Sequence, residues 1–105
     1  MSSKVKTTNL FYKKPFSSGE TFVSDPIDIS NANGLFSYHC IVTGSINLKA
    51  EVSLNGSDWV DVAGFDKNLS DTKITEPMDI PVSRLLRFKV TTSSAGEITL
   101  MFAYI

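Results

Sequence analysis

The sequence has few of the residues that form covalent or metal cross-links, since its 105 residues include one cysteine and one histidine. The lone Cys40 cannot form an intrachain disulfide, so the fold does not depend on oxidation. Because Cys40 stands in an apolar predicted strand, we expect it to behave as a small buried hydrophobic residue. A zinc site would have to consist mainly of carboxylates, which zinc rarely accepts. We therefore expect neither a metal nor a cofactor.

A strong charge of either sign is also missing. The formal net charge at pH 7 is -1, which removes the general attraction to phosphates on which most nucleic-acid-binding proteins depend. No apolar run approaches the roughly 20 residues of a membrane-spanning helix, and no basic start is followed by the apolar run of a signal peptide. We expect no nucleic-acid partner, no membrane partner and synthesis in the cytoplasm.

The charges that are present are unevenly placed. Residues 1–19 contain four lysines and no acid, whereas residues 51–79 contain seven acids and two lysines. Two interpretations stay open. Either both segments are ordinary solvated surfaces, or a basic arm contacts an acidic patch on a neighbouring copy of the chain.

Apolar and polar residues alternate strictly from Ile46 to Leu54, which is typical of a strand with one face against a core. The following pair, Asn55-Gly56, provides the two positive-φ positions of a tight hairpin turn. Clusters of turn-forming residues separate further short runs, which predict strands at 4–12, 20–23, 35–43, 46–54, 59–62, 73–80, 85–92 and 97–105. We therefore predict an all-β fold: an antiparallel two-sheet β-sandwich of jelly-roll type with about eight strands. Residues 1–105 form a single domain, with residues 1–14 as an N-terminal arm or edge strand.

The same alternation predicts one continuous core, made of Phe36, Tyr38, Val42, Val52, Leu86, Phe88, Leu100 and Phe102. The strand at 97–105 is unusual because its second face is apolar as well. An apolar second face requires a cover, which is either the N-terminal strand of the same chain or another subunit. In the second case, the candidate residues of the oligomer interface are Met101, Ala103, Ile105, Lys13 and Lys14.

We find no catalytic constellation in the sequence. His39 and Cys40 are adjacent in a predicted strand, so their side chains point to opposite faces and cannot form a dyad. The loop aspartates match no EF-hand spacing, and loop aspartates most often cap turns. We expect that the protein is not an enzyme.

Trp59 is the single residue that most resembles part of a binding site. An indole just after a hairpin turn either seals the end of a core or lies exposed as a stacking platform for a sugar. Asn55 and Asp58 stand beside it in the sequence and are able to hydrogen-bond sugar hydroxyls. These three residues form the candidate ligand site.

The segment Ser-Leu-Asn-Gly-Ser-Asp-Trp at 53–59 resembles the Ser-x-Asp-Gly-x-x-Trp hairpin of small β-sandwich proteins from tailed-phage virions and prophages, with Asn55 in place of the usual Asp. The segments 83–90 and 96–100 are similar to the closing pair of strands in the same proteins. A similar hairpin occurs in discoidin-like galactose-binding domains, but this chain is shorter and lacks their paired cysteines.

The resemblance implies a non-enzymatic structural or accessory protein that is incorporated into a virion. Its partners would be further copies of itself, as a homo-oligomer or ring, and other virion proteins. The alternative is a carbohydrate-binding module that uses Trp59 and the polar groups of its loop.

Overall fold

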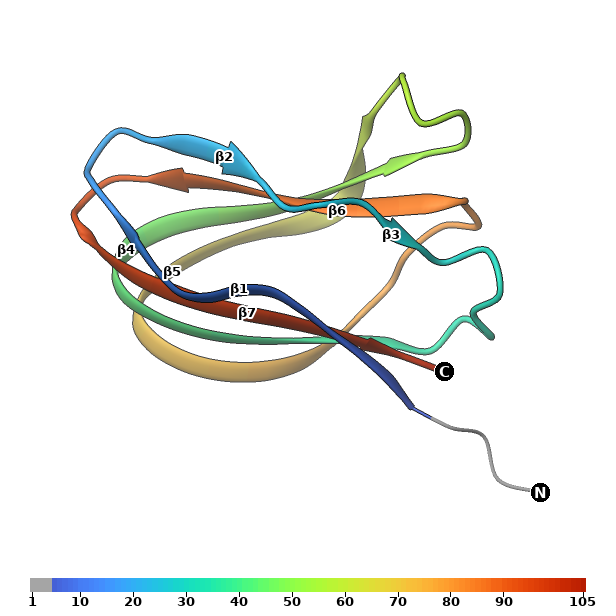
Figure 1. Cartoon of the computed structure of the whole chain (residues 1–105), viewed down its shortest axis with the longest axis horizontal. Coiled ribbons are helices and arrows are strands. Elements are labelled where there is room, and N and C mark those ends of the chain that lie inside the picture. The colour runs from blue at the N-terminus through green and yellow to red at the C-terminus, as the bar shows by residue number, and fades with distance from the viewer. Residues whose placement is uncertain (1–4) are drawn as a thin grey trace.

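The fold consists of β-strands in antiparallel pairs, and the prediction of an all-β antiparallel protein is confirmed (Figure 1). The structure is a computed structural model that describes residues 5–105, so Lys4, the start of the first predicted strand, lies outside the described residues. The strands are β1 (Lys6–Phe16), β2 (Thr21–Val23), β3 (Ile27–Asp28), β4 (Phe36–Ser53), β5 (Val60–Met78), β6 (Leu85–Thr92) and β7 (Gly96–Tyr104).

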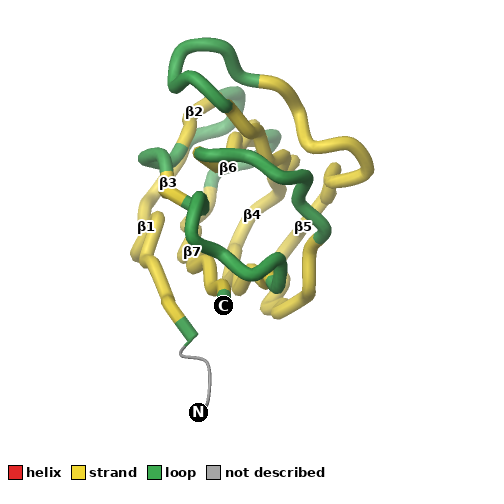
Figure 2. Tube along the Cα trace, turned by 90° about the vertical axis from the view of Figure 1, so that its right-hand side faces the viewer, coloured by secondary structure: helices red, strands yellow, loops and turns green. Residues whose placement is uncertain are grey.

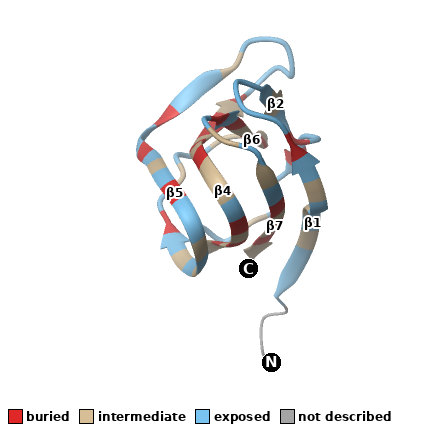
Figure 3. Ribbon diagram, turned by 90° about the vertical axis from the view of Figure 1, so that its left-hand side faces the viewer, coloured by how far each residue is buried: buried red, intermediate tan, exposed pale blue. Residues whose placement is uncertain are grey.

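Strand β4 is the centre of the sheet because it pairs along both of its edges. One edge pairs with β5 from Phe36 to Val52. The other edge pairs with β7 over residues 36–43 and with β6 over residues 46–53. β1 extends the sheet beyond β7, and β2 and β3 extend it beyond β6. Figure 3 shows β5, β4, β7 and β1 following one another across the molecule.

The sheet bends where β4 passes Gly44. Gly44 has a φ of 81° and Asp71, on β5, a φ of 45°, and the register between the two strands shifts at this level. Gly96 lies so close to the bend that a Cβ atom on it would overlap the carbonyl oxygen of Thr43, so only glycine fits there. The bend gives a curled half-barrel with a "β7 half" (β1, β7 and residues 36–43 and 72–78) and a "β6 half" (β2, β3, β6 and residues 46–53 and 60–70).

The core lies inside the curl, where aromatic rings of the two halves meet. Tyr38 packs edge-on against Phe65 with 5.2 Å between ring centres, and Phe88 packs against Phe102 at 5.9 Å. Six of the eight predicted core residues are buried, and the other two, Phe36 and Val52, are partly buried and pack against the core. The predicted core is therefore confirmed in its members.

Two predicted strand boundaries are wrong. Residues 44–45 and 63–72 separate predicted strands, but both segments lie inside β4 and β5. A bend inside a strand needs the same glycine and short polar residues as a turn between strands, so the local composition does not distinguish them. The finer prediction of two separate jelly-roll sheets is not confirmed, because hydrogen bonds join all the described strands into one sheet.

The connection between β4 and β5 is longer than the predicted two-residue turn. β4 ends at Ser53 and β5 begins at Val60, so residues 54–59 form the loop. Gly56 has the predicted positive φ, 82°, whereas Asn55 is not among the described residues with positive φ. The loop therefore depends on side-chain hydrogen bonds as well as on glycine.

Candidate functional site

The loop at residues 54–59 is held by its own polar side chains. Asn55 Oδ1 accepts hydrogen bonds from the backbone N–H groups of Ser57 and Asp58, both at 2.9 Å. Asn55 Nδ2 donates to Asp58 Oδ2 at 2.8 Å, and the backbone N–H of Gly56 donates to Ser53 Oγ at 2.8 Å. Both polar side-chain atoms of Asn55 are thus engaged inside the loop, which is a sufficient structural reason for this residue.

Trp59 lies half-buried on the outer surface of the β6 half and is not part of the core cluster. The guanidinium carbon of Arg87 is 4.2 Å from the centre of the indole ring. Arg87 Nε donates to Glu51 Oε1 at 2.7 Å, and Glu51 is almost entirely buried. The indole therefore stacks on the cation of a cross-strand ion pair. Sequence reasoning missed this pair, although Glu51 and Arg87 both occupy outward positions of alternating strands.

The apolar second face of β7 lies on the outside of the curl. Met101 and Ala103 line a hollow of about 320 Å³ together with residues from β1, β4 and β5, among them Thr7, His39 and Thr75. His39 Nδ1 and Thr75 Oγ1 are 2.6 Å apart. No lysine, arginine, aspartate or glutamate is among the described residues that line this hollow.

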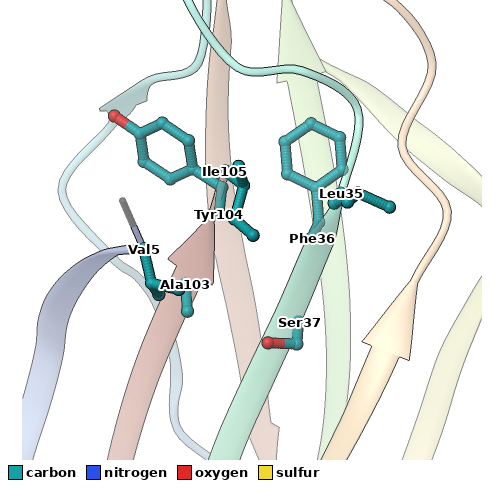
Figure 4. Close-up of a pocket in the computed structure, with 7 residues that line it drawn as sticks. All are labelled: Val5, Leu35, Phe36, Ser37, Ala103, Tyr104 and Ile105. Carbon is teal, nitrogen blue, oxygen red and sulfur yellow. The ribbon is translucent and has the colours of Figure 1, made fainter. Parts of the chain in front are cut away.

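A second hollow continues this face toward the end of β7 (Figure 4). It has a volume of about 240 Å³ and is lined by Ala103 and Ile105, with Val5 and Leu35 at its side. Val5 and Leu35 are 61% and 63% exposed. The structure therefore brings Met101, Ala103 and Ile105, three of the five predicted interface residues, to one continuous surface.

Strand β1 lies beside β7 and extends the sheet, so it does not lie across the outer face of β7. Asn9 pairs with Met101, and the next residues, Leu10 and Phe11, pack against the core. Lys14 pairs with Ile98, far along the strand from Met101. The other predicted lysine, Lys13, precedes it in β1, so the two lysines are not part of the same surface as Met101.

Of the three consecutive titratable residues of β4, Tyr38 and Cys40 lie on the inner face and His39 lies on the outer one. His39 contacts Thr75 on the outer face, whereas Cys40 is fully buried on the inner one, as the alternation predicted. Burial raises the pKa of Cys40 to about 11. Burial, and then the hydrogen bond from the Tyr38 hydroxyl to Glu76 Oε1 at 2.5 Å, raise the pKa of Tyr38.

No three His, Cys, Asp or Glu side chains among residues 5–105 come together in a group that could hold a metal ion. No helix in that part of the chain is long and apolar enough to cross a membrane.

Three solved structures have folds similar to this one. The SPBc2 prophage-derived protein YomS has a TM-score of 0.62 at 11% sequence identity, and the match covers 99% of this chain and 96% of YomS. A chain in the structure of infectious bursal disease virus Gx strain has a TM-score of 0.56 at 18% identity. That match covers 96% of this chain and 31% of the viral chain, so this chain spans about a third of it. PirA has a TM-score of 0.52 at 10% identity, with 100% of this chain and 96% of PirA covered.

No protein-family model and no curated protein matches the sequence. At these identities the likeness concerns the fold. The curled antiparallel sheet is thus shared with a viral and a prophage-derived protein, among others.

Proposed function

We propose that this protein is a non-enzymatic structural or accessory component of a viral or phage-type particle and that it acts by self-association. The likeness to YomS supports the proposal because it extends over nearly the whole of both chains and YomS is prophage-derived. The likeness to a chain of a virus structure supports it in the same direction. Within this proposal the two halves of the curled sheet act as the two layers of a jelly-roll sandwich.

The uncharged hollow around Met101 and Ala103, on the outer face of the β7 half, carries the proposal. A two-fold contact brings the same surface patch of both copies together, so a patch of like charges would repel itself. The hollow at Met101 and Ala103 is free of such charges, whereas the β6 half carries Lys49 directly opposite Lys89. The hollow at Met101 and Ala103 is therefore the electrostatically suitable surface for contact with a second copy.

The free edges of the sheet are less suitable for this contact. β1 shifts register twice and has Lys13 at a φ of 48°, and β5 is interrupted by Gly64 and Asp71 at positive φ and by Pro77. Bulges, charges and proline at an edge oppose strand-to-strand addition. We accordingly place the contact on a face.

The test is a change of Met101 to glutamate, which puts a charge at the centre of this face. We expect wild-type protein to scatter light as more than one chain at about 50 μM, and Met101→Glu to raise the dissociation constant at least tenfold, about 1.4 kcal/mol. The control is Thr91→Glu, which adds the same charge on the exposed side of β6. Equal melting temperatures of the two variants would show that both are folded.

Two results would contradict the proposal. One is wild-type protein that remains monomeric up to about 0.5 mM. The other is an equal effect of Met101→Glu and Thr91→Glu on the dissociation constant.

Carbohydrate binding at Trp59 remains the alternative proposal, supported by the half-exposed indole. The engagement of both polar atoms of Asn55 inside the loop disfavours it. Calorimetric binding of a monosaccharide from a panel, lost in Trp59→Ala, would favour the alternative over self-association.

A further inference from the structure

Strand β1 displays one large side chain that the core does not use. Tyr12 is 69% exposed, although its neighbour Phe11 packs against the core. Phe11 pairs with Leu100 and Lys14 with Ile98, so β1 spans three residues where β7 spans two. The extra residue in β1 produces a β-bulge at Tyr12 and Lys13. Bulges re-aim side chains and are common beside functional sites.

The bulge is held in an unfavourable backbone conformation. Lys13 has a φ of 48°, which disfavours a residue with a Cβ atom. Its backbone N–H is fixed by a 3.0 Å hydrogen bond to Thr99 Oγ1, and its ammonium group lies 5.5 Å from the centre of the Tyr12 ring. A strained, anchored conformation that presents an exposed aromatic ring is the kind of feature from which a function is inferred.

Loops gather at one end of the curl (Figure 2), and a further hollow lies between two of them. It has a volume of about 270 Å³ and lies between the loop at residues 54–59 and Val82. Three of its lining residues, Leu54, Val60 and Val82, are 67%, 66% and 101% exposed. Asp58 also lines it, and Asp61 follows Val60 in β5. Exposed apolar side chains gathered in one place mark an interaction surface.

We propose that Tyr12 of one copy inserts into this hollow on a second copy, with Lys13 facing Asp58 and Asp61. This rests on the proposed function, because it names a contact by which the self-associating protein extends beyond a dimer. The bulge and the hollow are different surfaces of the chain, so the contact is head-to-tail. Repeated contacts of this type close a ring or extend a filament, which a single two-fold contact cannot do.

Charge selects this hollow for Tyr12. The two hollows on the outer face of β7 are lined without a charged side chain among the described residues. The hollow at Val82 contains the carboxylate of Asp58, which complements Lys13, the residue that follows Tyr12 and has its ammonium group beside the Tyr12 ring. Tyrosine next to cations is also a typical anchor of protein interfaces, because it brings a large contact area with few rotatable bonds.

The experiment uses two variants, each with one half of the contact removed. Both also carry Met101→Glu, which weakens association through the outer face of the β7 half. Tyr12→Ser removes the inserted ring and keeps the hollow. Val82→Lys places a cation in the hollow and keeps the ring, and it does not disturb folding because Val82 is 101% exposed. Sedimentation is measured for each variant alone and for their equimolar mixture up to about 1 mM.

We expect each variant alone to sediment as a monomer and the mixture to approach the mass of two chains. Only the mixture combines an intact Tyr12 with an intact hollow. A second arm adds Lys13→Glu to the Val82→Lys chain, which should restore association of that chain with itself by exchanging the charges. Raised salt should weaken both complexes.

A mixture that stays monomeric, together with no rescue by Lys13→Glu, would overturn the contact. That result leaves the proposed function intact if Met101→Glu alone still weakens wild-type association. Conversely, a mixture that associates while Met101→Glu has no effect on the wild type would support the head-to-tail contact and remove the β7 face from the proposal.

Discussion

Cys40 and Tyr38 are ionisable residues that the core holds in their protonated forms. Cys40 is fully buried, and burial is the cause of its raised pKa. For Tyr38 burial comes first and the contact with Glu76 second. Both groups disfavour ionisation in the folded state, so both weaken the fold on the alkaline side only.

The pH dependence of stability should therefore reveal Cys40. The unfolded thiol ionises near its ordinary pKa of 9.0, while the folded one stays protonated up to about 11. The contribution of Cys40 is complete below about pH 9 and is lost as the pH rises to about 11, by roughly 1.4 kcal/mol per pH unit in between. Urea unfolding at pH 8 and pH 10.5 should show a larger loss for the wild type than for Cys40→Ala. An identical loss in both proteins would contradict the assignment.

At the level of single residues, the sequence predicts burial well and surface contacts poorly. Cys40, Phe88 and Phe102 are placed correctly because alternation along a strand depends on local geometry alone. The stacking of Trp59 on Arg87 depends on how the loop at residues 54–59 folds back over the sheet. That path is decided by hydrogen bonds of Asn55, which composition does not reveal.

Among the elements, the bend in β4 restricts the choice of residue most strongly. A Cβ atom on Gly44 would lie 2.5 Å from the carbonyl oxygen of Ala95, which belongs to the connection between β6 and β7. Real Cβ atoms do not approach a backbone oxygen so closely. The bend therefore requires glycine for space as well as for its φ.

Two glycines with the same φ separate these requirements. Gly44 and Gly64 both have a φ of 81°, but a Cβ atom on Gly64 meets nothing within 4 Å. Gly64→Ala should lower the free energy of unfolding by about 1 to 2 kcal/mol, from the left-handed conformation alone. Gly44→Ala should lower it by about 1 to 3 kcal/mol more, because the neighbouring backbone has to move. Chemical denaturation measures the free energy of unfolding of both variants. Equal losses would mean that the backbone near Gly44 accommodates a Cβ atom without moving.

The number and length of the elements were less predictable than their type. Gly44 and Asp71 look like turn residues in the sequence, yet each lies inside a long strand. A turn and a bend differ in whether the chain reverses direction, which long-range pairing decides. β3 has two residues and owes its existence to β6 alone.

For the whole molecule, the sequence predicts the fold class and leaves the arrangement of sheets open. The alternation of apolar residues predicts which face of each strand is buried, but it does not predict which strands pair. One curled sheet and two separate sheets bury the same residues. The candidate interface at Met101 was predictable because it is a departure from alternation, whereas the hollow at Val82 was not, because it combines residues from separate loops.

Pairing partners in this sheet differ greatly in their separation along the chain. β4 and β5 follow each other and are joined by a six-residue loop, residues 54–59, whereas β1 pairs with β7 across most of the sequence. Closing a long loop costs more conformational entropy than closing a short one, and this cost comes before the contacts that stabilise the pairing form. We therefore expect the transition state for folding to contain the β4–β5 hairpin and to lack β1.

Two substitutions of the same type test this order of events. Leu69→Ala, in β5, should slow folding, and Leu10→Ala, in β1, should mainly speed unfolding. Stopped-flow kinetics in urea separates the two rates for each variant. Equal slowing of folding by both would place β1 in the nucleus. If β1 docks last, the edge of β7 stays open longest during folding, and that edge is where a chain would first exchange strands with another copy.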